Sequence, residues 1–244
     1  MNTDNKLHIE VWSDVVCPFC FIGKRHYEQA LAQFEHADDV VLEWKSYQLD
    51  PEFVQPAERY DLEQGLAKKY NRPVEAIHAM QQQITNTAKE SGLDFDFSKA
   101  VTFNTFQAHR VLHKAKEKGL GDKAKEAFFS DYFEKGQDLG NNDVLKAEAL
   151  KIGLTEEDFN DAINNDDYAY KVKQDIQEAY ELGVTGVPFF VFDRKYAVSG
   201  AQPSDAFFNT LKASYDDWKE KQKTTPFINV SEQGASCDIN GNCD

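Results

Sequence analysis

The sequence predicts an α/β protein in which a small β-sheet is interrupted by a block of helices. Residues 7–12 (LHIEVW) alternate apolar and polar side chains, which is typical of a strand. Residues 40–49 (VVLEWKSYQL) are rich in β-branched and aromatic residues and predict a second strand. Strand patterns return at residues 187–192 and 196–199, joined by the short turn DRK. A long stretch of helical patterns separates these two groups of strands.

The first helix is expected directly after the first strand. Over residues 17–34, apolar side chains recur at roughly helical spacing, so the chain opens as strand, helix, strand. From about residue 59 to residue 182 strand patterns are replaced by helical ones. Gly92, Gly119 and Gly136 follow helical segments at positions where C-caps are expected.

Two further helices are expected before the second group of strands. Thr155 and Asp158 (TEED) resemble a capping box that opens one of them. Residues 168–182 carry apolar side chains four residues apart, and a final helix is expected over residues 204–221. This order describes a thioredoxin-type sheet with an inserted helical domain.

These patterns divide the chain into four parts. Residues 1–58 and 184–222 are expected to form the two halves of the thioredoxin-like domain, and residues 59–183 the helical insertion. Residues 223–244 form a polar tail that contains two cysteines.

The composition indicates a globular protein that does not bind polyanions. Of 244 residues, 41% are hydrophobic and 13% aromatic, which is enough to bury a core. The formal net charge of -15 would repel phosphate backbones and anionic lipids. The N-terminus lacks the apolar segment of a secretion signal, and no apolar run is long enough to span a membrane. We therefore expect a cytoplasmic protein without nucleic-acid or membrane partners.

Cys17 and Cys20 enclose Pro18 and Phe19 where the first strand gives way to the first helix. A thiol at a helix N-terminus lies at the positive end of the helix dipole, which favours the thiolate. We expect Cys17 to attack disulfides as the nucleophile and Cys20, one turn later, to resolve the mixed disulfide. Pro18 suits the first helical position because the N–H that it lacks would have no partner there. This chemistry needs no cofactor.

Other interpretations of the cysteines remain open. A zinc site would need a second pair of comparable spacing, whereas Cys237 and Cys243 are separated by five residues. His109 and His113 lie on one helix face but lack an evident third ligand, so no metal site is predicted. The cysteines could also be two inert buried thiols, but such thiols would not require a proline between them.

Two features near the CPFC motif are ambiguous. Asp14 precedes Cys17 by three residues, and its carboxylate could accept a proton during resolution while opposing thiolate formation. Aspartate is also common at turns that enter helices. If the tail is flexible, Cys237 and Cys243 could reach Cys17 and act as a relay dithiol. A stable local disulfide and idle thiols are the alternatives for this pair.

Four motifs occur in order along the chain: SDVVCPFCFIGKRHYEQAL, NTFQAHRVLHKA, VTGVPFFVF and AVSGAQP. Together they resemble the DsbA-like thioredoxin oxidoreductases, in particular the cytoplasmic FrnE-like branch, over about residues 7–215. The resemblance implies a thioredoxin-like fold with a helical insertion, and a thiol–disulfide oxidoreductase or isomerase acting on protein or small-molecule thiols and disulfides.

The resemblance also implies particular contacts with the substrate. A cis peptide bond before Pro188 would lie opposite the cysteines and turn the backbone of Val187 toward an extended substrate. Pro18 and Phe19, between the cysteines, would complete the substrate-binding surface. Secreted relatives carry His where this chain has Phe19, so their strongly oxidising potential is not implied.

Two rival functions remain at this point. One is a glutathione-dependent isomerase or transferase of the kappa-class type, whose members usually carry Ser at the attacking position; Cys20 argues against it. The other is a metal-binding or holdase module without catalysis. The direction of catalysis, the electron donor and the oligomeric state are not predicted by the sequence.

Overall fold

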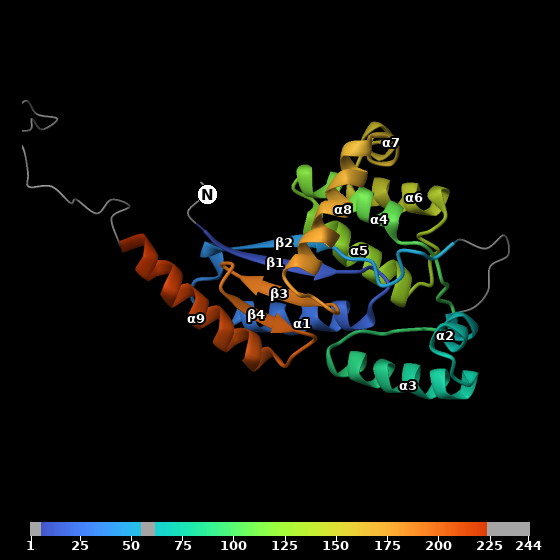
Figure 1. The fold of residues 1–244 in the computed structure, drawn as a ribbon, viewed down its shortest axis with the longest axis horizontal. Helices are drawn as coiled ribbons and strands as arrows, with labels where there is room; N and C mark the ends of the chain where they lie inside the picture. The colour runs from blue at the N-terminus through green and yellow to red at the C-terminus, as the bar shows by residue number, and fades with distance from the viewer. Residues whose placement is uncertain (1–5, 55–61, 224–244) are drawn as a thin grey trace, which may run out of the picture.

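A computed structural model describes residues 6–54 and 62–223, which include a four-stranded mixed sheet of strand order β2-β1-β3-β4 (Figure 1). β1 (Leu7–Ser13) pairs in parallel with β2 (Val40–Ser46). On its other side β1 pairs antiparallel with β3 (Phe189–Phe192), which pairs antiparallel with β4 (Tyr196–Ser199). The predicted α/β class is confirmed.

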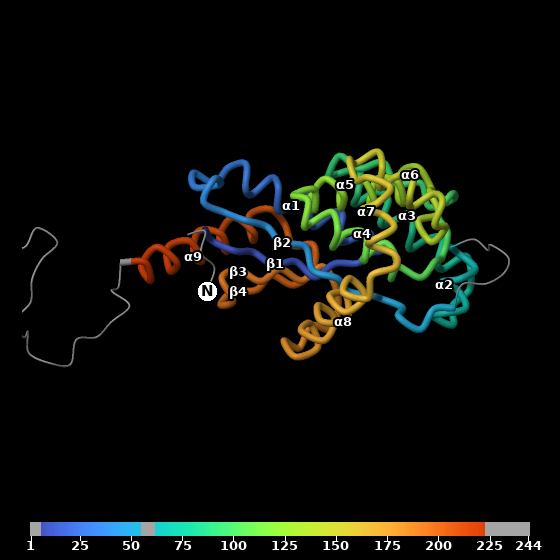
Figure 2. The backbone as a smooth tube through the Cα atoms, turned by 90° about the horizontal axis from the view of Figure 1, so that it is seen from above, coloured from blue at the N-terminus to red at the C-terminus, as the bar shows by residue number. Residues whose placement is uncertain are grey.

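Different helices cover the two faces of the sheet (Figure 2). Leu7, Ile9 and Val11 of β1 pack in one core with residues of α1 (Pro18–Ala32) and α9 (Ser204–Lys223). Trp12 packs in a separate core with Ala179 of α8 (Asp166–Glu181), and its indole N–H donates to the carbonyl of Asp175 at 2.8 Å. Alternate side chains of β1 point to opposite faces of the sheet, and helices pack on both faces, so the fold has three layers.

The helical insertion packs against the first turns of α1. Phe21 of α1 is fully buried, and its ring stacks on Phe129 at 5.0 Å and on Phe95 at 5.9 Å between centroids. Lys24 is also enclosed, with Nζ 2.9 Å from the carboxylate of Glu126. The inserted helices besides α8 are α2 (Leu62–Tyr70), α3 (Val74–Glu90), α4 (Phe106–Glu117), α5 (Gly121–Phe133), α6 (Asn142–Ile152) and α7 (Glu156–Asn164). No helix in the described residues has the length and apolar character needed to cross a membrane.

Most helix boundaries follow the sequence signals. Gly92, Gly119 and Gly136 all have positive φ, and Thr155 forms the expected capping box with Asp158. Helix α6 is an addition that the sequence patterns do not single out. It begins after Asn141, whose side chain accepts hydrogen bonds from two backbone N–H groups.

Two predicted strands are shorter than expected. β2 ends at Ser46 instead of Leu49, and the N–H of Leu49 donates to the carboxylate of Asp14 at 2.8 Å instead of to a neighbouring strand. β3 begins at Phe189, after Pro188, which has no N–H to donate. Because β2 ends early and β3 begins late, irregular backbone lies beside the CPFC motif.

Candidate active site

The turn between β1 and α1 positions the two cysteines. Cys17 is the N-cap residue of α1, its backbone is extended, and Pro18 takes the first helical position as predicted. The N–H of Cys20 donates to the carbonyl of Cys17 at 3.0 Å, which closes the first turn. Both cysteines are free thiols, with 4% of Cys17 and none of Cys20 exposed. Cys17 is therefore the sulfur that a substrate can approach.

The loop before β3 lies opposite Cys17. The peptide bond between Val187 and Pro188 is cis, as expected, and the Cys17 thiol donates to the carbonyl of Val187 at 3.4 Å. This close approach depends on Gly23, because a Cβ at that position would lie 3.0 Å from Cγ of Pro188. The geometry brings Cys17 and Val187 together.

The two thiols do not ionise equally. A hydrogen bond with Cys20 and burial raise the pKa of the Cys17 thiol well above its usual value. Burial opposes ionisation of Cys20, but the Cys17 thiol and the charge of Lys125 outweigh it, so the pKa of Cys20 is lowered. The lowering of the pKa of Cys17 expected from its helix position is thus opposed, in the reduced pair, by the hydrogen bond with Cys20 and by burial.

A buried lysine from the insertion faces the dithiol. Lys125 of α5 is 1% exposed, and its Nζ lies 3.5 Å from the carbonyl of Ser13. The ammonium also lies 4.9 Å from the ring centre of Phe129 and 5.4 Å from that of Trp44. Burial lowers the pKa of Lys125 to about 8, although the charges of Cys20 and Asp14 act to raise it.

Asp14 forms a buried contact between the two domains. It is fully buried, and its second carboxylate oxygen lies 3.1 Å from Nε2 of His109 in α4. Burial lowers the pKa of His109, so its ring is neutral near pH 7 and donates Nε2–H to the Asp14 carboxylate. Asp14 is thus a buried carboxylate beside the dithiol and not a simple turn residue.

The two histidines of α4 each have a partner other than a metal. His109 contacts Asp14, and Nε2 of His113 lies 3.1 Å from both the hydroxyl of Ser46 and the carboxylate of Asp175. Among the described residues, no group of three or more His, Cys, Asp or Glu side chains is arranged to hold a metal ion.

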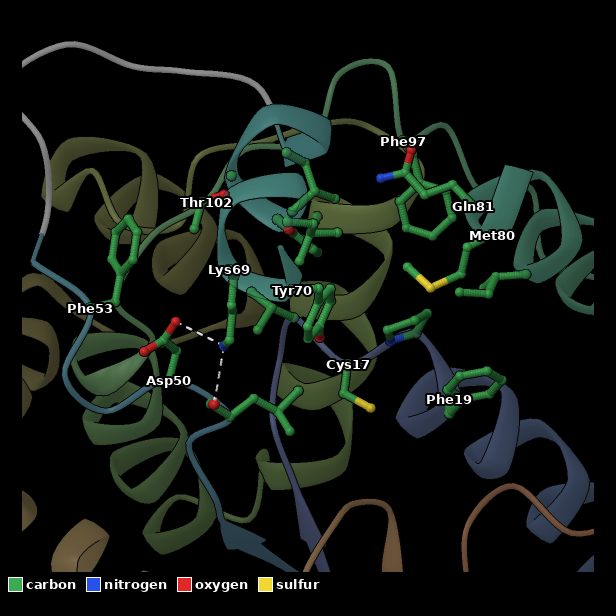
Figure 3. A pocket seen from close by; sticks show the side chains of 18 of the residues that line it. Cys17, Phe19, Asp50, Phe53, Lys69, Tyr70, Met80, Gln81, Phe97 and Thr102 are labelled. Carbon is green, nitrogen blue, oxygen red and sulfur yellow. Dashed lines mark hydrogen bonds and ion pairs between the residues drawn. The ribbon is translucent and has the colours of Figure 1, made fainter. Parts of the chain in front are cut away.

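A pocket of about 650 Å³ opens beside Cys17, between α1 and the helices α2 and α3 of the insertion (Figure 3). Phe19 and Leu49 line it and are each 43% exposed, and Tyr70 lines it with 52% exposed. Val187 also lines the pocket, so the sulfur, the substrate-facing loop and an apolar cavity are continuous.

The structure brings together the candidate residues of the described chain. Cys17, Pro18, Phe19 and Val187 all line the pocket; the other members, Cys20, Asp14 and Pro188, lie behind or beside it. The proposed relay cysteines, Cys237 and Cys243, lie outside the described residues.

Sequence reasoning missed Lys125 and the partner role of His109. A signal for Lys125 was present, because Phe128 and Phe129 lie three and four residues later on the same helix face. A lysine on an apolar face must either extend to solvent or meet a buried negative charge. The spacing does not show which negatively charged group lies near Lys125.

Comparison with known proteins defines the class. The sequence matches the DSBA-like thioredoxin domain family over residues 8–212, and the chain belongs to this family. It is a DsbA-like thiol–disulfide oxidoreductase with a thioredoxin-like fold and a helical insertion.

Three relatives illustrate the similarity. The uncharacterised protein YwbO of Bacillus subtilis (strain 168) is 30% identical over 217 residues, covering 88% of this chain and 99% of the relative. The crystal structure of a probable DsbA oxidoreductase from Streptomyces coelicolor is similar with a TM-score of 0.82 and 32% identity, covering 98% of both chains. The cytosolic disulfide reductase DsbM from Pseudomonas aeruginosa, solved with GSH, shares the fold with a TM-score of 0.62 and 16% identity, covering 86% of this chain and 100% of that one.

Proposed function

We propose that this chain is a cytoplasmic thiol–disulfide oxidoreductase or isomerase in which Cys17 attacks and Cys20 resolves. The observation that carries this proposal is the difference in access: Cys17 opens onto the pocket beside Val187, whereas Cys20 is completely enclosed behind it. The cytosolic disulfide reductase DsbM, which shares the fold, supports the cellular location.

The ionisation of the pair suits an attack that begins only when a substrate is present. In the reduced pair, a hydrogen bond with Cys20 and burial raise the pKa of Cys17, and the pKa of Cys20 is lowered. Transfer of the Cys17 proton to Cys20 turns Cys17 into the thiolate that attacks a substrate sulfur. The substrate disulfide bond breaks, its first sulfur leaves as a thiolate, and the second stays bonded to Cys17.

Resolution requires Cys20 to lose the proton again. Asp14 is the acceptor we propose, because its charge acts on Cys17 and on Lys125 within the same buried site. Cys20 then attacks the sulfur of Cys17, the second substrate thiolate leaves, and the Cys17–Cys20 disulfide forms. The substrate gains two electrons and the protein loses two. The reverse sequence transfers a disulfide to a substrate.

Trapping tests these roles directly. The variant Cys20→Ser, mixed with a disulfide-bonded peptide, should accumulate a mixed disulfide that peptide mapping places on Cys17. The variant Cys17→Ser should accumulate none at Cys20, because that position is enclosed. An adduct found only on Cys237 or Cys243, or equal trapping in both variants, would contradict the assignment.

The same variant addresses the glutathione-dependent alternative. A transferase or isomerase that activates glutathione needs only the attacking position. The glutathione-dependent function would be favoured by two results together. Cys20→Ser would keep full activity on an aromatic substrate in the presence of glutathione, and it would lose no disulfide reduction.

A further inference from the structure

The pocket beside Cys17 contains a buried amide without a partner. Gln81 is 4% exposed, and neither its side-chain oxygen nor its nitrogen has a hydrogen-bond partner. It lies on the apolar face of α3, with Ile77 one turn before it and Ile84 three residues after it. An unpaired buried amide destabilises the folded protein, because it gives up hydrogen bonds to water without replacing them. An apolar residue would suit the fold better, so the amide needs another explanation.

A second polar atom of the pocket is in the same condition. The hydroxyl of Thr102 is buried without a partner, and Thr102 and Gln81 both line the cavity. In Figure 3 Thr102 and Gln81 lie on opposite sides of the pocket, and both are set back from Cys17. The remaining wall is mostly apolar, including Met80 and Phe97. This is the usual composition of a small-molecule site: apolar walls with a few placed polar groups.

The charges at the pocket do not suit an ionic ligand. Lys69 forms an ion pair with Asp50 at 2.8 Å, which neutralises both groups. Lys68 is the other charged residue among those that line the cavity, and it is exposed. Carboxylates of a ligand body that pass beyond Lys68 into the interior would enter a mostly apolar cavity, which is costly.

The shape favours a compact ligand over a peptide chain. The mouth is formed by exposed residues such as Phe19 and Tyr70, whereas Phe103 and Tyr132 are buried and close the interior. A peptide that crosses the mouth would direct side chains inward and keep its main-chain amides outside. A ligand with an amide in its body brings both a donor and an acceptor to Gln81.

We infer that this pocket binds the body of a low-molecular-mass disulfide or thiol, neutral and mostly apolar, whose amide is separated from its sulfur by an apolar spacer. Gln81 binds the amide while Cys17 meets the sulfur. This inference rests on the proposed function, because it uses Cys17 as the attacking thiol. In the reaction, the compound R–S–S–R receives two electrons from Cys17 and Cys20, which form their disulfide, and two R–SH molecules leave.

Oxidation of the reduced full-length protein by a series of disulfides tests the inference. The probes are pantethine, which is neutral and carries amides, bis(2-hydroxyethyl) disulfide, which has no amide, oxidised glutathione, which is charged, and a disulfide-bonded peptide. After correction for intrinsic reactivity with a free thiol, pantethine should react at least about tenfold faster than each of the others. A preference for glutathione or for the peptide would overturn the inference.

Variants connect this preference to the amide. Gln81→Met keeps the volume and removes both hydrogen bonds, so the preference for pantethine over bis(2-hydroxyethyl) disulfide should fall about tenfold. Gln83→Met, an exposed change two residues away on α3, is the matched control and should keep the preference. An unchanged preference in Gln81→Met would refute the role of the amide.

A redox-inactive ligand separates this inference from the proposed function. S-methyl pantetheine cannot form a disulfide, and it should raise the melting temperature of the wild-type protein but not that of Gln81→Met. If no disulfide oxidises Cys17 and Cys20, the proposed function fails, and ligand-induced stabilisation still reports on the pocket. If all disulfides react according to their intrinsic reactivity and S-methyl pantetheine does not stabilise the protein, the pocket inference fails while the proposed function stands.

Discussion

Nε2 of His109 lies 3.1 Å from the carboxylate of Asp14, and both side chains are almost completely enclosed. Asp14 follows β1 of the sheet, whereas His109 belongs to α4 of the insertion. Lys125, which faces Cys20, also comes from the insertion. The helical insertion therefore acts on the charge of the dithiol and also lines the pocket beside Cys17.

The first prediction concerns Asp14. Its negative charge raises the pKa of Cys17, so Asp14→Asn should make the Cys17 thiolate easier to form. Without the proposed proton acceptor, resolution by Cys20 should slow, so a mixed disulfide on Cys17 should persist several-fold longer. Rapid acid quenching followed by mass spectrometry measures its lifetime.

The exposed acidic residue Asp122 provides a control, and Asp122→Asn should leave the mixed-disulfide lifetime unchanged. A shorter or equal lifetime in Asp14→Asn would remove Asp14 from the resolution step.

The second prediction concerns the charge of Lys125 on the dithiol. That charge lowers the pKa of Cys20, so Lys125→Met should raise the pH at which the first thiol ionises. Ultraviolet absorbance of the thiolate across a pH series measures this shift. A first ionisation at the wild-type pH or below it in Lys125→Met would show that the charge of Lys125 does not act on Cys20.

The third prediction uses the same lysine to test stability. The pKa of Lys125 is about 8 in the folded protein against 10.5 as its ordinary value, so protonation opposes folding below pH 8. This penalty is fully present below pH 8 and is relieved as the pH rises to 10.5. Lys125→Met should therefore have a higher free energy of unfolding than wild type at pH 7, by at most roughly 3 kcal/mol, and the difference should shrink toward pH 10.5.

Denaturant unfolding of the reduced proteins at several pH values measures this difference. Lys123→Met, an exposed change on the same helix, should show no such pH-dependent gain. A Lys125→Met protein that is less stable than wild type at pH 7 would mean that contacts of the ammonium outweigh its burial.

The sequence predicts the fold and the two cysteines because their signals are local. Strand alternation in β1, the capping box of Thr155 and the position of Pro18 in the first turn of α1 each depend on neighbouring residues. The cis bond at Pro188 was predicted only through the resemblance to a family.

The interior of the site could not be predicted in this way. The charge of Lys125 acts on Cys20, and His109 contacts Asp14, across 105 and 95 positions of the chain respectively. The direction of the pKa shift at Cys17 depends on its hydrogen bond with Cys20 and on burial, and neither follows from the helix position alone. Gln81 was hidden in the same way, because an amide on an apolar helix face has no meaning until its lack of a partner is known.

The last prediction concerns the close approach of α1 to the loop that carries Val187. A Cβ on Gly23 would lie 3.0 Å from Cγ of Pro188 and 3.5 Å from Cα of Ala201, so Gly23→Ala requires a shift of a few tenths of an ångström. Alanine in a helix interior normally stabilises by about 1 kcal/mol relative to glycine. We expect the steric contact to offset that gain, and the displaced Val187 carbonyl to slow disulfide reduction several-fold because it no longer meets Cys17 correctly. Thermal unfolding and the rate of peptide-disulfide reduction measure the two effects, with the exposed change Gln29→Ala on α1 as the control. A Gly23→Ala protein that gains the full helix stabilisation and keeps the wild-type rate would show that the site tolerates a wider separation between α1 and Pro188.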